Sequence, residues 1–233
     1  MSDPGTPAAE FDAAAADYDR QLNLGLTWSG EAKEFYAVER MRWLRSRLDA
    51  LGGTYADALD FGCGTGTSAP LLAEIAGARR VVGTDPSGES LVVARRLHPH
   101  PALRFVPPAE VPAAAFDLAF CNGVFHHIPV DERHAAARQV HDALRPGGVF
   151  AFWENNPWNP GTRFIMSRVP FDRDAVTLTP PEARRLLRAA GFTVLRTDFR
   201  FVFPRALAAL RPLEPALAAL PLGGQYLVLC RRP

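Results

Sequence analysis

The chain has 233 residues, 48% of them hydrophobic, and a formal net charge of +1 at pH 7. This length suits one α/β domain with a full core, and the scattered arginines do not predict a nucleic-acid partner. No apolar run of about 18 residues and no leader-like N-terminus are present, so we expect a cytoplasmic protein with no membrane partner. The three cysteines lack metal-like spacing, which predicts buried thiols in a reducing compartment and no metal site.

A helical segment is expected ahead of the core. Residues 11–23 have a helix-compatible pattern, and apolar residues spaced four and three apart predict a stronger helix from about 31 to 48. We therefore divide the chain into an N-terminal helical segment, 1–50, and a core, 51–233. The core carries insertions at about 155–178 and 204–222.

A glycine-rich turn follows the first predicted strand of the core. The apolar run 56–61, which contains Asp60, breaks into glycines at alternate positions, Gly62, Gly64 and Gly66. Glycine permits positive φ and lets a ligand lie against the main chain, and the next helix start offers N–H groups to an anionic group. Thr67 stands where a dinucleotide fingerprint needs its third glycine. A nicotinamide oxidoreductase is therefore the least favoured function.

The D-x-G-x-G-x-G pattern resembles motif I of the class I S-adenosylmethionine (SAM) methyltransferases. The resemblance implies a Rossmann-like, doubly wound α/β sheet of seven strands, mostly parallel with an antiparallel last strand, and helices on both faces. It also implies SAM as cofactor. The methionine part of SAM would then lie along Asp60 and the backbone of the turn, namely Phe61, Gly62, Cys63, Gly64 and Gly66.

An acidic residue stands at the end of the second predicted strand, 80–84. Asp85 lies about 20 positions beyond the glycine-rich turn, and a carboxylate can accept two hydroxyl hydrogen bonds. The spacing predicts that Asp85, with Pro86 beside it, holds a ribose. A helix N-cap before the segment 89–97 is the alternative role for Asp85, and the two roles are compatible.

The third predicted strand, 103–106, leads into Pro107-Pro108-Ala109-Glu110. The resemblance implies that Ala109 and Glu110 flank the adenine of SAM. Related methyltransferases usually carry an acidic residue where this chain has Pro108. That departure leaves open a SAM-binding protein without catalytic activity.

Two adjacent histidines follow the fourth predicted strand, 116–121. Ligands of open parallel sheets bind beyond the carboxyl ends of the strands, so Asn122, Gly123, His126 and His127 should face the cofactor. This loop resembles motif IV of the same family. One histidine is a candidate general base, and the alternative is that one caps the loop while the other packs under it.

The fifth predicted strand, 149–153, follows an LRPGG turn that again resembles the family, and the resemblance covers about residues 56–153. Glu154 is a candidate catalytic residue that accepts a proton or orients a substrate group. The candidate substrate residues beyond it are Asn155, Trp158, Arg163 and Arg168. We expect at least one arginine of this insertion to reach an anionic substrate group, and solvated surface arginines are the alternative.

The C-terminal part carries clear boundary signals. A capping box at Thr179 and Glu182 opens a helix that Gly191 ends, and a long strand is expected over 192–203. Two short helices between 204 and 221 would roof the substrate cleft, and 225–230 would form the antiparallel last strand. In the family resembled, an N-terminal segment folds over the cofactor, so Tyr18 and Trp28 are candidate lid residues or simply packing aromatics.

Together these features predict a SAM-dependent methyltransferase that modifies an oxygen or nitrogen of a small-molecule metabolite, in biosynthesis and specialised metabolism. We expect the protein to bind a small-molecule substrate and neither nucleic acid nor a membrane. The assembly that we consider is a homodimer. Two alternatives stay open. One is a SAM-binding enzyme of cyclisation or elimination, and the other is an inactive SAM-binding regulatory subunit.

Overall fold

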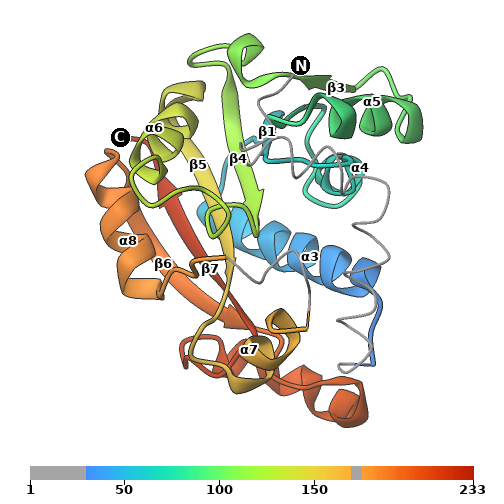
Figure 1. Ribbon diagram of the computed structural model, residues 1–233, viewed down its shortest axis with the longest axis vertical. Coiled ribbons are helices and arrows are strands. Elements are labelled where there is room, and N and C mark those ends of the chain that lie inside the picture. Colours follow the sequence, from blue (N-terminus) through green and yellow to red (C-terminus); the bar gives the residue numbers. More distant parts are fainter. Residues whose placement is uncertain (1–29, 169–174) are drawn as a thin grey trace.

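The computed structural model describes residues 30–168 and 175–233, so Tyr18, Trp28 and the helix expected over 11–23 lie outside the described residues. Its centre is a seven-stranded sheet in the order β3-β2-β1-β4-β5-β7-β6 (Figure 1). β7 runs antiparallel to both of its neighbours, and the other pairs are parallel. The predicted fold class is confirmed. The strands are β1 (Asp57–Phe61), β2 (Arg80–Thr84), β3 (Leu103–Val106), β4 (Phe116–Asn122), β5 (Leu144–Asn155), β6 (Thr193–Arg200) and β7 (Gln225–Arg231).

Helices cover both faces of the sheet (Figure 1). On one face lie α3 (Lys33–Leu51), α4 (Ser68–Glu74) and α5 (Gly88–Leu97), and on the other lie α6 (Arg133–Ala143) and α8 (Pro180–Ala189). The central strands β1 and β4 are therefore buried on both sides, which explains their nearly continuous apolar sequences. The remaining helical pieces are short: η2 (Pro108–Glu110), α7 (Pro160–Met166), η4 (Arg205–Leu213) and α9 (Glu214–Leu217).

Helix α3 is an integral part of the hydrophobic core. Met41, Leu44 and Leu48 are buried in it. A buried polar contact also joins the helix to β6, because Trp43 Nε1 and Arg47 Nε donate to the same carboxylate oxygen of Asp198, at 3.0 and 2.9 Å. Such a charged acceptor is stabilised only while its donors remain in place. The contact ties the C-terminal half of α3 to β6.

Several local boundaries differ from the expected ones. β6 covers Thr193–Arg200 and so ends three residues before the expected 203. α7 forms within the predicted insertion, where the Asn159 side chain accepts from Thr162 N and Pro160 occupies the first helical turn. The N-cap of α5 is Ser87, whose hydroxyl accepts from Ser90 N, so the alternative capping role for Asp85 was wrong. β5 begins at Leu144, five residues before the expected start, because pairing with β4 already begins there.

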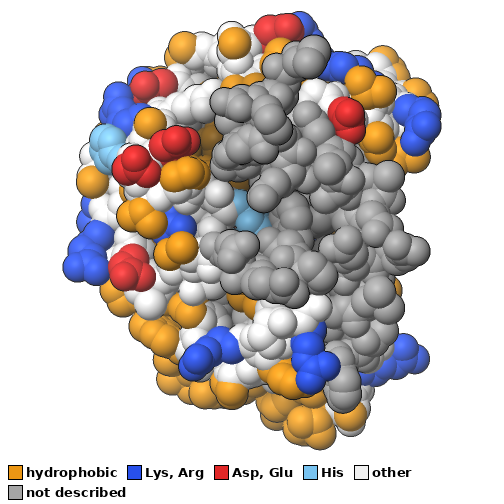
Figure 2. Space-filling view, in the orientation of Figure 1, with side chains coloured by type: hydrophobic (Ala, Val, Ile, Leu, Met, Phe, Trp, Pro, Cys, Tyr) orange, Lys and Arg blue, Asp and Glu red, His pale blue; other side chains and the backbone are white. Residues whose placement is uncertain are grey.

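The segment 204–221, which contains η4 and α9, lies at the carboxyl ends of the parallel strands, with α7 nearby (Figure 1). Three leucines of η4 point outward: Leu207, Leu210 and Leu213 are 47%, 40% and 55% exposed. Hydrophobic side chains gather at this lower end of the molecule in Figure 2. Within 30–168 and 175–233, no helix is both long and apolar enough to cross a bilayer.

Candidate active site

The glycine-rich turn is tied to the end of β2. Gly62 N and Cys63 N both donate to Thr84 O, at 2.8 and 3.0 Å, and Gly64 N donates to Asp85 Oδ2 at 2.8 Å. The other oxygen of Asp85 accepts from Ser87 N at 2.9 Å. One buried carboxylate therefore orders both the turn and the start of α5.

The glycines of this turn serve different purposes. A Cβ at Gly62 would overlap the Val124 side chain, and one at Gly66 would lie 2.9 Å from the Phe105 ring, so these two positions are closed by packing. At Gly64, where φ is +50°, no atom of the described residues lies within 4 Å of a Cβ. Within the described part of the chain, the main chain at Gly64 therefore leaves space beside it for another group.

Two buried acceptors end adjacent strands beside this turn. Among the described residues, none donates a hydrogen bond to Asp60 Oδ2 at the end of β1 or to Asn122 Oδ1 at the end of β4. Asp60 is 2% exposed. Its burial, and secondarily the nearby Asp85 carboxylate, raise the pKa of Asp60 to about 7. Unpaired buried acceptors are costly, so this pair is suited to a ligand that brings a hydrogen-bond donor.

The residues expected around adenine form an exposed turn after β3. Ala109 and Glu110 lie in η2, and Pro86, in the loop between β2 and α5, is also exposed. The Glu110 carboxylate pairs with Arg104 at 3.5 Å. Both partners are largely exposed, so this pair contributes little to stability and leaves Glu110 able to change partner.

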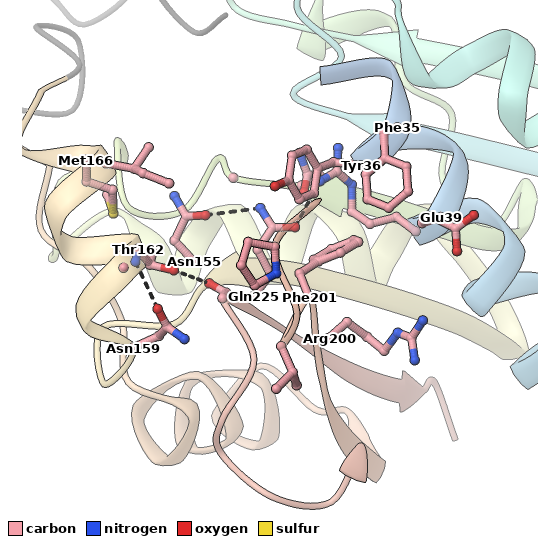
Figure 3. Close-up of a pocket in the computed structure, with 18 of the residues that line it drawn as sticks. Phe35, Tyr36, Glu39, Asn155, Asn159, Thr162, Met166, Arg200, Phe201 and Gln225 are labelled. Carbon is pink, nitrogen blue, oxygen red and sulfur yellow. Dashed lines mark hydrogen bonds between the residues drawn. The ribbon is translucent and has the colours of Figure 1, made fainter. Parts of the chain in front are cut away.

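A cavity of about 570 Å³ adjoins the ends of β4, β5 and β7 (Figure 3). Such a volume suits a small-molecule ligand. α3, the loop after β4, α7 and the segment after β6 form its walls. They include Lys33, Phe35, Tyr36, Glu39, Arg40, Asn122, Gly123, His126, His127, Asn155, Asn159, Thr162, Phe164, Ile165, Met166, Phe201, Arg211 and Gln225.

A buried histidine and carboxylate meet at the wall of this cavity. His126 Nδ1 lies 2.6 Å from Glu154 Oε2, and the exposed fractions of the two side chains are 3% and 1%. The other oxygen of Glu154 accepts from Phe125 N at 2.8 Å. Both carboxylate oxygens are therefore occupied, and Glu154 fixes the loop as well as the imidazole.

This geometry selects one tautomer of a neutral His126. A carboxylate can only accept, so the ring proton lies on Nδ1 and the lone pair on Nε2. The His127 ring packs beside it, with ring centroids 4.1 Å apart. The structure thus brings together the three residues predicted to be catalytic, with His126 and His127 at the cavity and Glu154 behind His126.

The predicted substrate residues separate into two groups. Asn155 lines the cavity, whereas the described part of its wall does not include Trp158, Arg163 or Arg168. Trp158 is 49% exposed, and the Arg168 guanidinium lies 4.9 Å from the centre of the Phe164 ring. Sequence reasoning missed Arg40 and Gln225, two polar residues of the wall. The only available signal was Gln225 opening the last strand at the edge where ligands bind.

A buried carboxylate shapes the wall after β6. Glu214, which is 3% exposed, accepts from the backbone N–H groups of Phe201, Val202 and Phe203 at 3.0 to 3.2 Å. Phe201 has a φ of +66°, which is unusual for a residue with a side chain. Glu214 therefore stabilises a strained turn whose residues face the cavity.

Replacing Glu214 with alanine is expected to lower the free energy of unfolding by roughly 3 to 5 kcal/mol, because three backbone donors lose their buried partner. Chemical denaturation of the full chain measures this. The matched control is Glu39→Ala, which removes an ion pair with Arg42 that is partly exposed and should cost about 0.2 to 1 kcal/mol. Equal effects of the two substitutions would contradict a special role for Glu214.

We searched the described part of the chain for side chains that could bind a metal ion together. No group of three or more His, Cys, Asp or Glu side chains is placed to hold an ion there.

The comparisons with known proteins agree on one family. Residues 59–150 match the model of a methyltransferase domain. A probable SAM-dependent methyltransferase of Mycolicibacterium smegmatis is 31% identical over 188 residues, which are 76% of this chain and 70% of that protein. The trans-aconitate 2-methyltransferase of Azoarcus sp. (strain BH72) is 33% identical over 146 residues, 62% of this chain, but the match spans only 57% of that enzyme.

A solved structure has the same fold. A SAM-dependent methyltransferase from Thermotoga maritima superposes with a TM-score of 0.66 over 98% of this chain and all of the other, at 14% identity. The fold, the glycine-rich turn and the M. smegmatis relative together assign the chain to the SAM-dependent methyltransferases. The cofactor of this family of enzymes is SAM.

Proposed function

We propose that the chain transfers the methyl group of SAM to a hydroxyl oxygen or an amine nitrogen of a small-molecule metabolite. The observation that carries this proposal is the buried His126–Glu154 pair at the wall of a 570 Å³ cavity. A positioned base of this kind is useful for an acceptor that must lose a proton as it attacks. The cavity meets the glycine-rich site at Asn122 and Gly123, so donor and acceptor would lie side by side.

The residues present fit SAM. The open main chain at Gly64 leaves room for its methionine part, and the unpaired oxygens of Asp60 and Asn122 suit an ammonium group. In the proposed arrangement Asp85 and Pro86 hold the ribose, while Ala109 and Glu110 flank adenine. The backbone of Phe61, Gly62, Cys63 and Gly66 completes the turn. When bound, SAM supplies a methyl group activated by a sulfonium.

The remaining steps belong to the chain itself. His126 Nε2 accepts the proton of a hydroxyl group as it attacks, or the proton that an ammonium group loses before the resulting amine attacks, and Glu154 stabilises the imidazolium that forms. The walls from α3 and α7 hold the acceptor close to the methyl group and exclude water, which lowers the entropic part of the barrier. His127 packs against His126 and limits its rotation.

A second candidate is methylation of a carboxylate, which the trans-aconitate 2-methyltransferase relatives favour. A carboxylate is already ionised at neutral pH and needs no base, so His126 would then only position the acceptor. The two candidates differ in product. A methyl ester releases methanol in mild alkali, whereas a methyl ether or amine does not.

The deciding experiment is an assay of the purified chain with SAM and a panel of hydroxy acids, phenols, amines and trans-aconitate, read by mass spectrometry. We expect a product heavier by one methylene together with S-adenosylhomocysteine (SAH), and the alkali test then assigns the atom. A product of unchanged mass formed only in the presence of SAM would favour the cyclisation or elimination alternative. SAH binding without any product would favour the regulatory one.

Cofactor affinity should depend on pH through Asp60. Below pH 7 this carboxyl is mostly protonated in the ligand-free protein, and it must ionise to pair with an ammonium group. We expect the affinity for SAH, measured by calorimetry, to rise by up to about tenfold per pH unit below 7 and to level off above.

Asp60→Asn is the control for this pH dependence, since it should flatten the profile and weaken binding at pH 8. A wild-type affinity that stays constant between pH 5.5 and 7 would contradict the pairing. The stability of the ligand-free fold depends on pH in the opposite direction from the SAH affinity. Because burial raises the folded-state pKa of Asp60, this group lowers stability as pH rises from about 4 to 7, and its ligand removes that penalty.

A further inference from the structure

Three polar side chains form a hydrogen-bonded row along the wall of the acceptor cavity. Arg40 NH1 donates to Gln225 Oε1 at 2.9 Å, and Gln225 Nε2 donates to Asn155 Oδ1 at 3.1 Å. The row runs from α3 across β7 to the end of β5, and Figure 3 shows its bond between Gln225 and Asn155. Asn155 and Gln225 are direct cross-strand partners in the sheet, so their side chains leave the same face together.

The row has a defined polarity. Arginine can only donate, so Gln225 must turn its oxygen toward Arg40 and its nitrogen toward Asn155. Asn155 must then turn its own oxygen toward Gln225, which leaves its nitrogen pointing away from Gln225 (Figure 3). Among the described residues none accepts a hydrogen bond from Asn155 Nδ2. The cation at one end of the row therefore determines that Asn155 offers donors to the cavity.

Arg40 is held firmly enough to impose this order. It is 8% exposed and sits one turn before Trp43, on the helix that Asp198 ties to β6. The charged side chains of the cavity wall also favour an anionic ligand, as the donor at Asn155 does. Of the acidic and basic side chains in the described wall, four are basic and two are acidic: Lys33, Arg40, Arg200 and Arg211 against Glu39 and Glu214.

Given the methyl transfer proposed above, we infer that Arg40 and Gln225 are positioning residues that orient the Asn155 amide to bind a carboxylate group of the methyl acceptor. The acceptor is then an acid that binds at Asn155 through its carboxylate while its nucleophilic atom lies near His126. Arg40 and Gln225 act through Asn155.

The test reverses the polarity of the row. In Gln225→Glu both side-chain oxygens accept, so Asn155 must turn its nitrogen toward residue 225 and its oxygen toward the cavity. Calorimetry of the full chain loaded with SAH then compares the affinity for a carboxylic acid with the affinity for an analogue of similar shape in which nitrogen donors replace the carboxylate oxygens. The probes are 4-hydroxybenzoate against 4-hydroxybenzamidine, and trans-aconitate against its triamide.

We expect the wild type to bind at least one acid 10-fold or more tightly than its nitrogen analogue, and Gln225→Glu to lower that ratio by at least 10-fold. SAH affinity should stay within twofold. Asn155→Asp removes the donor without touching the Arg40–Gln225 bond and should lower the ratio equally, which keeps the test decisive if one variant fails to fold. Arg40→Lys should retain the acid preference better than Arg40→Met.

The charge control is Asn159→Asp. It adds the same negative charge to the cavity wall and keeps the cap on α7, with the loss of the hydrogen bond from Nδ2 to Leu222 O. Because the Arg40–Gln225–Asn155 row stays intact, its ratio should fall far less than that of Gln225→Glu. No acid preference in the wild type, or a ratio unchanged within threefold in Gln225→Glu and Asn155→Asp, would overturn the inference. Binding to the SAH-loaded chain involves no methyl transfer, so failure here is distinguishable from failure of the methylation assay.

Discussion

Glu154→Gln is expected to lower kcat for the methylated acceptor by about 10²- to 10⁴-fold, the usual contribution of a positioned general base. The amide keeps one oxygen for Phe125 N, so the loop stays anchored. Its nitrogen, however, now donates to His126 Nδ1, which moves the ring proton to Nε2 and removes the basic lone pair from the cavity. The measurement is steady-state turnover, with SAH affinity as the check that the site is intact.

Controls separate this loss of the base from damage to the fold. Glu182→Gln changes an exposed carboxylate of the α8 capping box and should leave kcat unchanged. His126→Ala should be as slow as Glu154→Gln, and the double variant hardly slower, because the two residues act as one unit. Turnover of Glu154→Gln within threefold of the wild type would remove the base from the mechanism. A methyl ester product would then be expected.

Asp85→Ala is expected to weaken SAH binding by about 10- to 100-fold, since charge-assisted hydrogen bonds to hydroxyls contribute about 1.5 to 3 kcal/mol each. The same substitution releases Gly64 N and Ser87 N, so the glycine-rich turn loses one of its contacts, while Gly62 N and Cys63 N still donate to Thr84 O at the end of β2. Titration calorimetry measures the affinity, and NADH serves as a ligand that should not bind.

The matched control for Asp85 is Asp57→Ala at the opposite end of the first strand. Asp57 pairs with Arg80 and Arg145, far along β1 from the glycine-rich turn, and its loss should leave SAH affinity unchanged. Asp85→Asn keeps one acceptor and should fall between alanine and the wild type. Wild-type affinity in Asp85→Ala would contradict the ribose contact and leave Asp85 a purely structural residue.

The strands and the cofactor turn were predictable because their signals are local. The apolar run before Gly62 can be read as a buried parallel strand, and β2 and β3 begin and end at the expected residues. The family resemblance supplied the prediction of a seven-stranded sheet with an antiparallel last strand, which the structure confirms. α7 was missed although Asn159 and Pro160 form an ordinary helix start, because the prolines before it favoured a loop.

The partners within the site were not predictable. His126 and Glu154 are 28 residues apart, and both were named as candidates, but their contact depends on β4 and β5 lying side by side. Arg40 and Gln225 are 185 residues apart and belong to α3 and β7. Neither residue stands in a motif. The sequence analysis placed the α3 helix in an N-terminal segment, 1–50, separate from the core, 51–233. In the structure α3 packs into the hydrophobic core and forms part of the cavity wall.

By itself, then, the sequence determined the class of fold, the turn at Gly62 to Gly66 and the carboxylates at the ends of β1 and β2, since strand periodicity and glycine conformation depend on neighbouring residues. Only the tertiary structure decided which ring nitrogen of His126 carries the proton and which way the Asn155 amide faces. Both depend on a single donor or acceptor brought from a distant strand or helix. Hydrogen-bond direction is set by such partners in space, and no local pattern records them.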